Sequence, residues 1–433
     1  MPVARLKPML RHLSALKQMP KRGHAAAAGM VSIGLRALLL LAKFAFVVVL
    51  AKYTDTATVG IYALLVTIVT IAIYVIGLEL HTFTAREIVA DPSEGSSHGG
   101  VHIQSHLQTL TGVFVIALPV VWGVILWLGL MGKFSFLLLS VIILLEIFGQ
   151  ELGRYLLVLS RPVASNVLQF IRGAAWMPVP VALLLAGRAG HVIDTILTSW
   201  LVGALLACLF GFWRIRSFLS PFRAWKLSWL NQAFFSARHY FAVALLTQVQ
   251  YYSDRFVVQR VMGEAAVGVL SFYQSFASTM VAFVQTGVIS VMLPRLLLAA
   301  KRDDRAEESR VRRVIFAWAM TLAIGISAGL AIGMPILLHL MNKPGYASSL
   351  PIFYVLLLGN VVLIAGLVMH LSLYARHRDA QLMRVSLVVI PLSLMSNAFA
   401  VPVFGIQGAV CVFVLTASAD LAAKYWLLKR TDR

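Results

Sequence analysis

The sequence predicts an all-α polytopic membrane protein, with about twelve transmembrane helices in two six-helix bundles around a central cavity. Three observations lead to this class. Apolar segments of about 20 residues, the length that crosses a ~30 Å hydrocarbon core, follow one another from Ala25 to Leu428. The 433 residues are 60% hydrophobic and only 12% charged, a balance foreign to soluble domains. Finally, a short motif of the first half recurs in the second.

The apolar segments should all be helices, because lipid offers backbone N–H and C=O groups no other partner. We expect spans at 25–50, 58–80, 107–131, 134–158, 163–186, 192–213, 236–260, 265–290, 314–339, 350–373, 382–403 and 405–428. This pattern divides the chain into four parts. They are a basic N-terminal segment at 1–24, a first bundle at 25–213, a linker at 214–235 and a second bundle at 236–433.

The basic residues predict the orientation of the chain. A net charge of +20 would suggest nucleic-acid binding in a soluble protein, but here the positive-inside rule accounts for it, and we expect no nucleic-acid partner. Lysine and arginine gather in the linker 214–235, in the connection 295–313 and in the C-terminal tail. The opposite connections hold only Lys52, Lys133, Arg188 and Lys343. Both termini and the linker are therefore predicted to be cytoplasmic.

The internal repeat lies where the first span meets the second and where the seventh meets the eighth. Residues 57–61 (ATVGI) match residues 265–269 (AAVGV), and Gly60 and Gly268 are 268 − 60 = 208 positions apart. A glycine suits a tight turn at such a junction. The repeat predicts two related halves that run in the same sense. The alternative is that both copies are ordinary turns of helix hairpins, with no relation between the halves.

Prolines interrupt several spans, at Pro119, Pro178, Pro180, Pro335 and Pro391. Each removes a helical hydrogen bond and favours a kink. The pair at 178 and 180 is the strongest candidate for a break that could act as a hinge, and a static bend is the alternative.

Charged residues inside spans are costly and usually face a partner or a cavity. Arg36 and Lys43 lie seven residues apart, nearly two turns, so they share one face of the first span. That span contains no carboxylate, so the two cations need a partner elsewhere, such as Glu146 or Glu151, or an anion. We expect them to face the central cavity.

The remaining candidates follow from the same argument. Glu151 and Arg154 can pair at i,i+3, Arg172 lies in the fifth span within reach of the inner surface, and the seventh span carries a polar and aromatic face. The candidate substrate-binding residues are Arg36, Lys43, Arg154, Arg172, Gln248, Tyr252 and Arg255. The candidates for ion coupling are Glu146, Glu151 and Asp254, which could instead neutralise arginines. This excess of cations favours a phosphate or pyrophosphate group as the ligand.

Motifs of catalytic or metal chemistry are missing from the sequence. It contains no GxxxxGK[ST], HExxH, CxxC or GxSxG, so we expect no enzyme activity, cofactor or metal. His98, His102 and His106 have the i, i+4, i+8 spacing of a helix face, but they lie in a polar connection, 81–106, and solvated histidines are the favoured interpretation. Asp420 and Lys424 are expected to form a local structural pair.

Two stretches resemble the bacterial oligosaccharide flippases of the multidrug/oligosaccharidyl-lipid/polysaccharide exporter superfamily. In the first half the matching residues are Thr54, Asp55, Gly60, Tyr62, Gly77, Leu78 and Arg86. In the second half they are 254–258 (DRFVV), 262–264 (MGE), 267–268 (VG) and 293–295 (LPR). One departure is Leu270, where the family often has tyrosine.

The resemblance implies a function, which we state as an expectation. It implies a flippase that moves undecaprenyl-pyrophosphate-linked oligosaccharide, a repeat unit of O-antigen, capsule or exopolysaccharide, across the bacterial inner membrane by alternating access. Its partners would be that lipid, the bilayer and polysaccharide polymerase machinery. One alternative is a multidrug or cation antiporter of the same superfamily, which would need an acidic site. A membrane polysaccharide polymerase is another, but it would need a large external loop.

Overall fold

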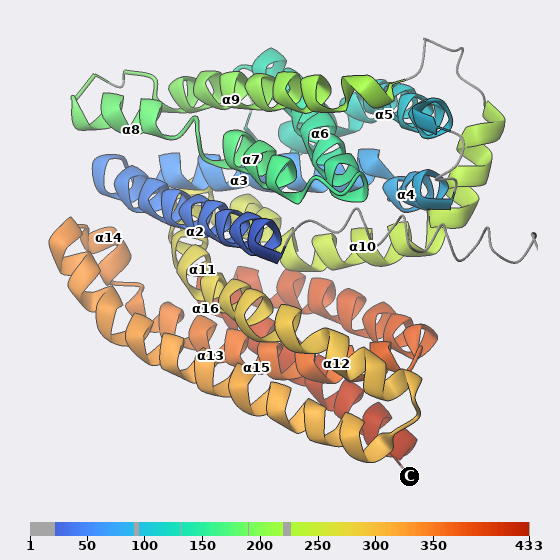
Figure 1. The fold of residues 1–433 in the computed structure, drawn as a ribbon. Coiled ribbons are helices and arrows are strands. Elements are labelled where there is room, and N and C mark those ends of the chain that lie inside the picture. Colours follow the sequence, from blue (N-terminus) through green and yellow to red (C-terminus); the bar gives the residue numbers. More distant parts are fainter. Residues whose placement is uncertain (1–21, 91–94, 131, 189, 220–226, 433) are drawn as a thin grey trace, which may run out of the picture.

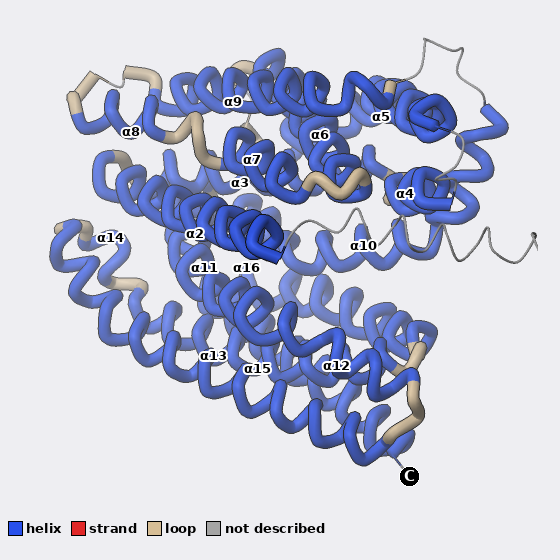
Figure 2. Tube along the Cα trace, in the orientation of Figure 1, coloured by secondary structure: helices blue, strands red, loops and turns tan. Residues whose placement is uncertain are grey.

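The computed structural model describes residues 22–90, 95–130, 132–188, 190–219 and 227–432. Over these residues every regular element is a helix and none is a strand, which confirms the predicted class (Figure 2). The predicted N-terminal segment 1–24 lies almost wholly outside the described residues.

The helices form two layers that follow the order of the chain (Figure 1). The first contains α2 (Arg22–Tyr53), α3 (Thr56–Gly77), α4 (His81–Ala90), α5 (Gly95–Trp127), α6 (Phe136–Val158), α7 (Pro162–Gly173), α8 (Pro178–Leu185) and α9 (Val192–Ile215). A 3-10 turn, η1 (Arg216–Phe218), follows it. The second contains α11 (Glu264–Val284), a π-helical turn η2 (Gln285–Ile289), α12 (Ser290–Lys301), α13 (Arg305–Met341), α14 (Pro344–Ala347), α15 (Leu350–Ala375) and α16 (Asp379–Asp432). Between them, α10 (Leu227–Met262) packs against α16, α3 and α11.

The number of spans agrees with the prediction once two helices are inspected. Among the described residues, ten helices are long and apolar enough to cross a membrane. One of the ten is α16, which is really two helices joined at Gly405, whose φ of 61° and ψ of −142° are not helical. The helix α10 is 36 residues long but too polar to be among the ten. Counting α10 and both parts of α16 restores the predicted twelve.

The polar connections are more helical than expected. The sequence predicts an internal loop at 81–106, but the structure has α4 there and the first turns of α5. Likewise, α12 continues to Lys301 and α13 begins at Arg305. Apolar runs mark only the part of a helix within lipid, so hydropathy misses helical turns that extend into water.

The predicted break in the fifth span is confirmed. The span is divided into α7 and α8, and Pro178 is the first residue of α8, a position where its missing N–H costs nothing. The Trp176 Nε1–H donates to the carbonyl of Arg172 at 3.1 Å, which satisfies one backbone oxygen freed at the break. In contrast, Pro119, Pro335 and Pro391 lie inside continuous helices.

The two copies of the repeat contact each other. Gly60 and Gly268 lie within α3 and α11, not in turns as the sequence suggested. A Cβ atom on Gly60 would lie 1.9 Å from the carbonyl oxygen of Glu264, and one on Gly268 would lie 1.9 Å from that of Thr56. Each oxygen belongs to the residue four positions before the opposite glycine, so the contact is symmetric. The helices therefore cross backbone against backbone, as small residues permit in membranes.

We predict that Gly60→Ala and Gly268→Ala will each destabilise the protein. A methyl group at either position has no room, so the expected cost is about 3 kcal/mol, the upper end of typical overpacking effects. Thermal unfolding of the purified protein in detergent measures the change. Gly325→Ala is the control, because a Cβ there meets nothing within 4 Å. Equal midpoints for Gly60→Ala and Gly325→Ala would contradict the close crossing.

Candidate functional site

A cavity of about 340 Å³ lies where the two layers meet. Its walls come from α2, α3, α10 and α11, which are the first two spans of each half. The lining residues are Leu40, Lys43, Phe44, Val47, Val59, Tyr62, Ala63, Val66, Tyr251, Tyr252, Arg255, Ser271, Phe272, Ser275, Phe276, Ser278, Thr279 and Ala282. Two of them are cations, and no carboxylate is among them. The cavity is therefore electropositive, as the sequence suggested.

Arg255 is held in place by residues of three helices. Its Nη1 donates to the Thr67 hydroxyl of α3 at 2.8 Å, while Nε and Nη2 donate to Gln274 Oε1 of α11 at 3.2 and 3.1 Å. The guanidinium also lies over the Tyr252 ring, 5.0 Å from its centroid. Gln274 completes the network by donating to Asp254 at 2.6 Å. These bonds fix the orientation of Arg255 and join the two halves.

Lys43 is the second cation of the cavity and has no fixed partner. Within the described part of the chain it forms no ion pair and donates no hydrogen bond. Its stem runs past Gly173 of α7, where a Cβ would lie 3.6 Å from Lys43 Cε. Phe44, the next residue, meets Phe276 across the junction with ring centroids 4.3 Å apart. The ammonium group is thus available to a ligand.

Hydroxyl groups line the α11 wall, and sequence reasoning missed them. Ser271, Ser275 and Thr279 are spaced by four residues, so they form one stripe of the helix and all line the cavity. This spacing is visible in the sequence, and a search for polar stripes would have found it. By contrast, the roles of Thr67 and Gln274 depend on contacts between helices and could not be found that way.

Arg36 lies outside the cavity, although it shares a face of α2 with Lys43. Its side chain is exposed, and Nε donates to Asn166 Oδ1 of α7 at 2.9 Å. It lies one turn before Leu40, the first lining residue of α2. The spacing of the two cations fixes their shared face but not the depth at which the cavity ends. Gln248 of α10 is half-buried and does not line the cavity either.

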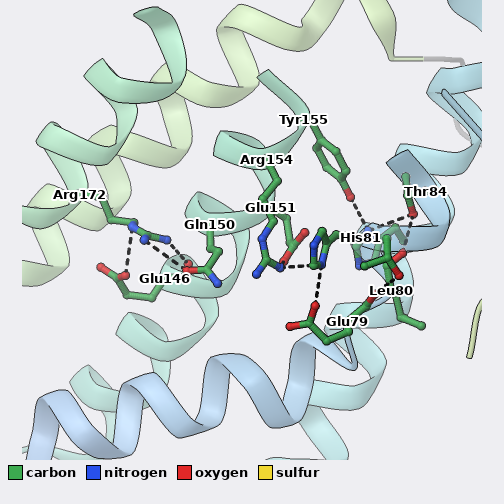
Figure 3. Close-up of polar contacts among 12 residues, drawn as sticks. Glu79, Leu80, His81, Thr84, Glu146, Gln150, Glu151, Arg154, Tyr155 and Arg172 are labelled. Atoms are coloured by element: carbon green, nitrogen blue, oxygen red, sulfur yellow. Dashed lines mark hydrogen bonds and ion pairs between the residues drawn. The ribbon is translucent and has the colours of Figure 1, made fainter. Parts of the chain in front are cut away.

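Arg172 and Glu146 pair inside the first layer instead of facing the cavity (Figure 3). The Arg172 Nε lies 3.4 Å from Glu146 Oε2, and its Nη2 donates to Gln150 Oε1 at 3.3 Å. The Trp200 indole N–H donates to Glu146 Oε1 at 2.8 Å. Both oxygens of the buried carboxylate are therefore satisfied within the first six spans.

Arg154 and Glu151 form a second network near the end of α3 (Figure 3). The predicted pair is present, with Arg154 Nη1 2.6 Å from Glu151 Oε1. The same nitrogen donates to His81 Nδ1 at 2.9 Å. Burial and the Arg154 charge lower the pKa of His81 to about 3, so the imidazole is neutral and accepts this bond. Neither charged residue lines the cavity.

The structure also corrects the prediction that the histidines of the 81–106 connection are solvated. His106 is fully buried, and its Nδ1 lies 2.6 Å from the Tyr155 hydroxyl and 3.3 Å from that of Thr84. His102 accepts the Trp229 indole N–H at 3.0 Å. Because α5 begins at Gly95, both lie on a helix face packed against α4, α6 and α10. No cluster of histidine, cysteine or carboxylate residues able to hold a metal occurs in the described ranges, and the side chain of His98 lies outside them.

The predicted pair at the end of the chain is present. Lys424 Nζ lies 2.5 Å from Asp420 Oδ2 on the second part of α16. This pair is local, so it is a structural feature of one helix.

Solved structures of other proteins share this fold. The lipid II flippase MurJ in an inward closed conformation matches with a TM-score of 0.72 and 12% identity, over 92% of this chain and 87% of that chain. An inward-facing multidrug resistance MATE family transporter of the MOP superfamily matches with a TM-score of 0.62 and 13% identity, over 93% and 97%. A MOP superfamily transporter from Pyrococcus furiosus, with reverse polarity of its binding pocket, gives 0.52 and 11%, over 93% and 94%.

Neither models of protein families nor curated proteins match the chain. The structural likeness nevertheless confirms the predicted all-helical architecture. At 10–14% identity it shows the fold alone.

We predict that Arg172→Gln will destabilise the protein by about 3–5 kcal/mol, because it leaves the buried Glu146 charge without its cation. Adding Glu146→Gln should recover most of that loss, since the amide oxygen can still accept from Trp200. Thermal unfolding in detergent of the single and double variants provides the measurement. A double variant no more stable than Arg172→Gln would contradict the pairing.

Proposed function

We propose that the chain is a flippase for a polyprenyl-pyrophosphate-linked oligosaccharide, working by alternating access in the bacterial inner membrane with both termini in the cytoplasm. The observation that carries the proposal is the cavity between the halves, which holds two cations and no lining carboxylate. One of these cations, Lys43, forms no hydrogen bond or ion pair among the described residues, and Glu146, whose charge it feels, is already paired with Arg172. An anionic headgroup would offset the free-energy cost of holding both cations within the membrane.

The chemistry of the two cations suits a pyrophosphate. A guanidinium carries five N–H donors, and Thr67 and Gln274 use three of those on Arg255, so two remain for a ligand. Lys43 adds an ammonium group from α2. The hydroxyls of α11 and the rings of Tyr251 and Tyr252 suit sugar units. The polyprenyl tail needs no lined path because it stays in the bilayer.

The contacts between the halves support alternating access. Beside the glycine crossing, Lys133 Nζ lies 3.5 Å from Glu264 Oε1, and Lys343 Nζ donates to the Thr54 carbonyl at 2.7 Å. These contacts lie at the end where α3 and α11 begin, which the positive-inside rule assigns to the outside. This end is closed in the structure, and release of the headgroup would require these contacts to break.

Asp254 is the carboxylate best placed to couple an ion to transport. Gln274 donates to Asp254 and accepts from Arg255, so protonation of Asp254 would change the amide that holds the ligand-binding guanidinium. The other two candidates, Glu146 and Glu151, are each engaged by an arginine of their own half. We therefore narrow the proposed site to Lys43, Tyr252 and Arg255, with Asp254 as the coupling residue.

The antiporter alternative is less well supported. A site for cationic drugs needs a carboxylate, and the cavity has none among its lining residues. The likeness to MATE transporters concerns the fold, which proteins of different function share.

We predict that Lys43→Ala and Arg255→Ala will each reduce translocation at least about tenfold, the loss expected when a charge-assisted bond worth ~1.5 kcal/mol is removed. Proteoliposomes with a fluorescent undecaprenyl-pyrophosphate-linked sugar provide the measurement. Arg255→Lys should keep part of the activity, and Arg36→Ala should cost less. Arg260→Ala, an exposed change on the same helix, is the matched control. Full transport by Lys43→Ala at normal expression would defeat the proposal.

We also predict that fixing the closed end will stop transport. In a variant whose Cys208 and Cys411 are replaced by serine, Lys133→Cys and Glu264→Cys can be joined by a short reducible linker between thiols. The joined protein should lose translocation and regain it on reduction, because the halves can no longer separate. The control carries only one of the two new cysteines. Transport through the joined protein would exclude opening at this end.

A further inference from the structure

A second cavity lies between the first turns and the last turns of α16, at the end of the helix pair remote from Gly405. It has a volume of about 560 Å³ and lies between residues 381–389 of the first part and 423–430 of the second. None of its lining residues belongs to the central cavity. The lining residues are Gln381, Arg384, Val385, Val388, Val389, Ala423, Trp426, Leu427 and Arg430.

The walls of this groove are divided into an apolar part and a cationic part. Val385, Val388, Val389 and Leu427 supply aliphatic surface, and Val388 is 68% exposed, as expected of a side chain that faces lipid. Arg384 and Arg430 lie nearer the ends of the chain segments that form the groove. Such a division matches an amphiphile with apolar chains and an anionic head.

The two arginines are free to bind an anion. Neither forms an ion pair with a carboxylate in the described part of the chain, and the nearby Lys424 already pairs with Asp420. The Arg430 guanidinium lies 3.6 Å from the centroid of the Trp426 ring. Stacking on the ring fixes the plane of the guanidinium while leaving its N–H edge open, and tryptophan favours the level of lipid headgroups.

We propose that this groove binds an anionic glycerophospholipid of the surrounding bilayer. The phosphate accepts from Arg384 and Arg430, and the acyl chains lie along the valine wall. The occupant is a bilayer lipid and not the transported lipid, because the groove lies between two parts of one helix and shares no residue with the cavity at the junction. It lies on the side predicted to be cytoplasmic, where anionic lipids attract arginine.

A lipid in this groove would brace α16. Its two parts are joined at Gly405, whose backbone is not helical, and the lipid would contact both at the opposite end. Because α16 packs against α10, the helix that carries Arg255, a lipid here would also support one wall of the central cavity.

Native mass spectrometry of the purified protein with phosphatidylglycerol or phosphatidylcholine tests the proposal. Wild-type protein should retain phosphatidylglycerol preferentially. The Arg384→Gln, Arg430→Gln double variant should bind it about 30-fold more weakly, the effect of two surface arginines at ~1 kcal/mol each. Val388→Trp, which fills the groove without changing charge, should weaken it as well. The matched control, Arg302→Gln with Arg310→Gln, removes two exposed arginines elsewhere and should bind normally.

Three outcomes would overturn the proposal. The first is equal retention of the two phospholipids by wild-type protein. The second is undiminished phosphatidylglycerol binding by the double variant, with its fold verified by an unchanged unfolding midpoint. The third is displacement of phosphatidylglycerol from wild-type protein but not from Val388→Trp by undecaprenyl pyrophosphate, which would make the groove a site for the transported lipid.

Discussion

The crossing of α3 and α11 at Gly60 and Gly268 is the contact on which the rest of the structure depends. Within a bilayer no hydrophobic force pulls helices together, so close backbone approach and its many dispersion contacts must hold them. Because the glycines let these helices touch, Thr67 of α3 comes within bonding distance of Arg255 on α10, and Gln274 of α11 does so from the other side. The same approach closes one end of the cavity. A larger residue at either glycine would disturb packing, polar network and closure together.

The charged residues of the spans fall into two groups with different surroundings. In the first half, two arginines within spans, Arg154 and Arg172, are each matched by a carboxylate on a nearby helix turn or neighbouring helix. At the junction the balance differs: Arg255 is bound mainly by neutral oxygens, and Lys43 is bound by nothing described. Paired charges hold the helices of one bundle together. Charges between the bundles that lack a carboxylate partner would be stabilised by an anionic ligand. This contrast distinguishes the cations that we propose to bind substrate from those that pair within the first half.

Much of the fold could be predicted from the sequence, because apolar length and glycine or proline position act locally. The spans and the break before Pro178 depend on neighbouring residues. The repeat at Gly60 predicted two related halves, but it did not predict that its two copies contact each other. The site was only partly predictable. Helical spacing placed Lys43 and Arg255 on inward faces, but it gave no depth, and so it also included Arg36.

What the sequence could not provide was the partner of each polar group. Arg172, Arg154 and Arg255 are the same residue type within predicted spans, and only their contacts distinguish them. His106 was expected in solvent because a polar stretch hides the start of α5, yet it is buried beside Tyr155. Such errors arise wherever a helix extends beyond lipid and loses its apolar signal.

The polarity of α10 has a consequence for how the protein is made. Asp254 and Arg255 would each cost free energy within lipid if α10 were inserted alone, and α10 is too polar to be among the helices apolar enough to cross a membrane. We therefore expect α10 to enter the membrane together with its neighbours and not alone. Of the residues that bond to this pair, Thr67 lies on α3, which is synthesised before α10, and Gln274 lies on α11, which is synthesised directly after it. On this expectation the order of the helices along the chain is also an order of assembly, in which α3 is available before α10 is inserted.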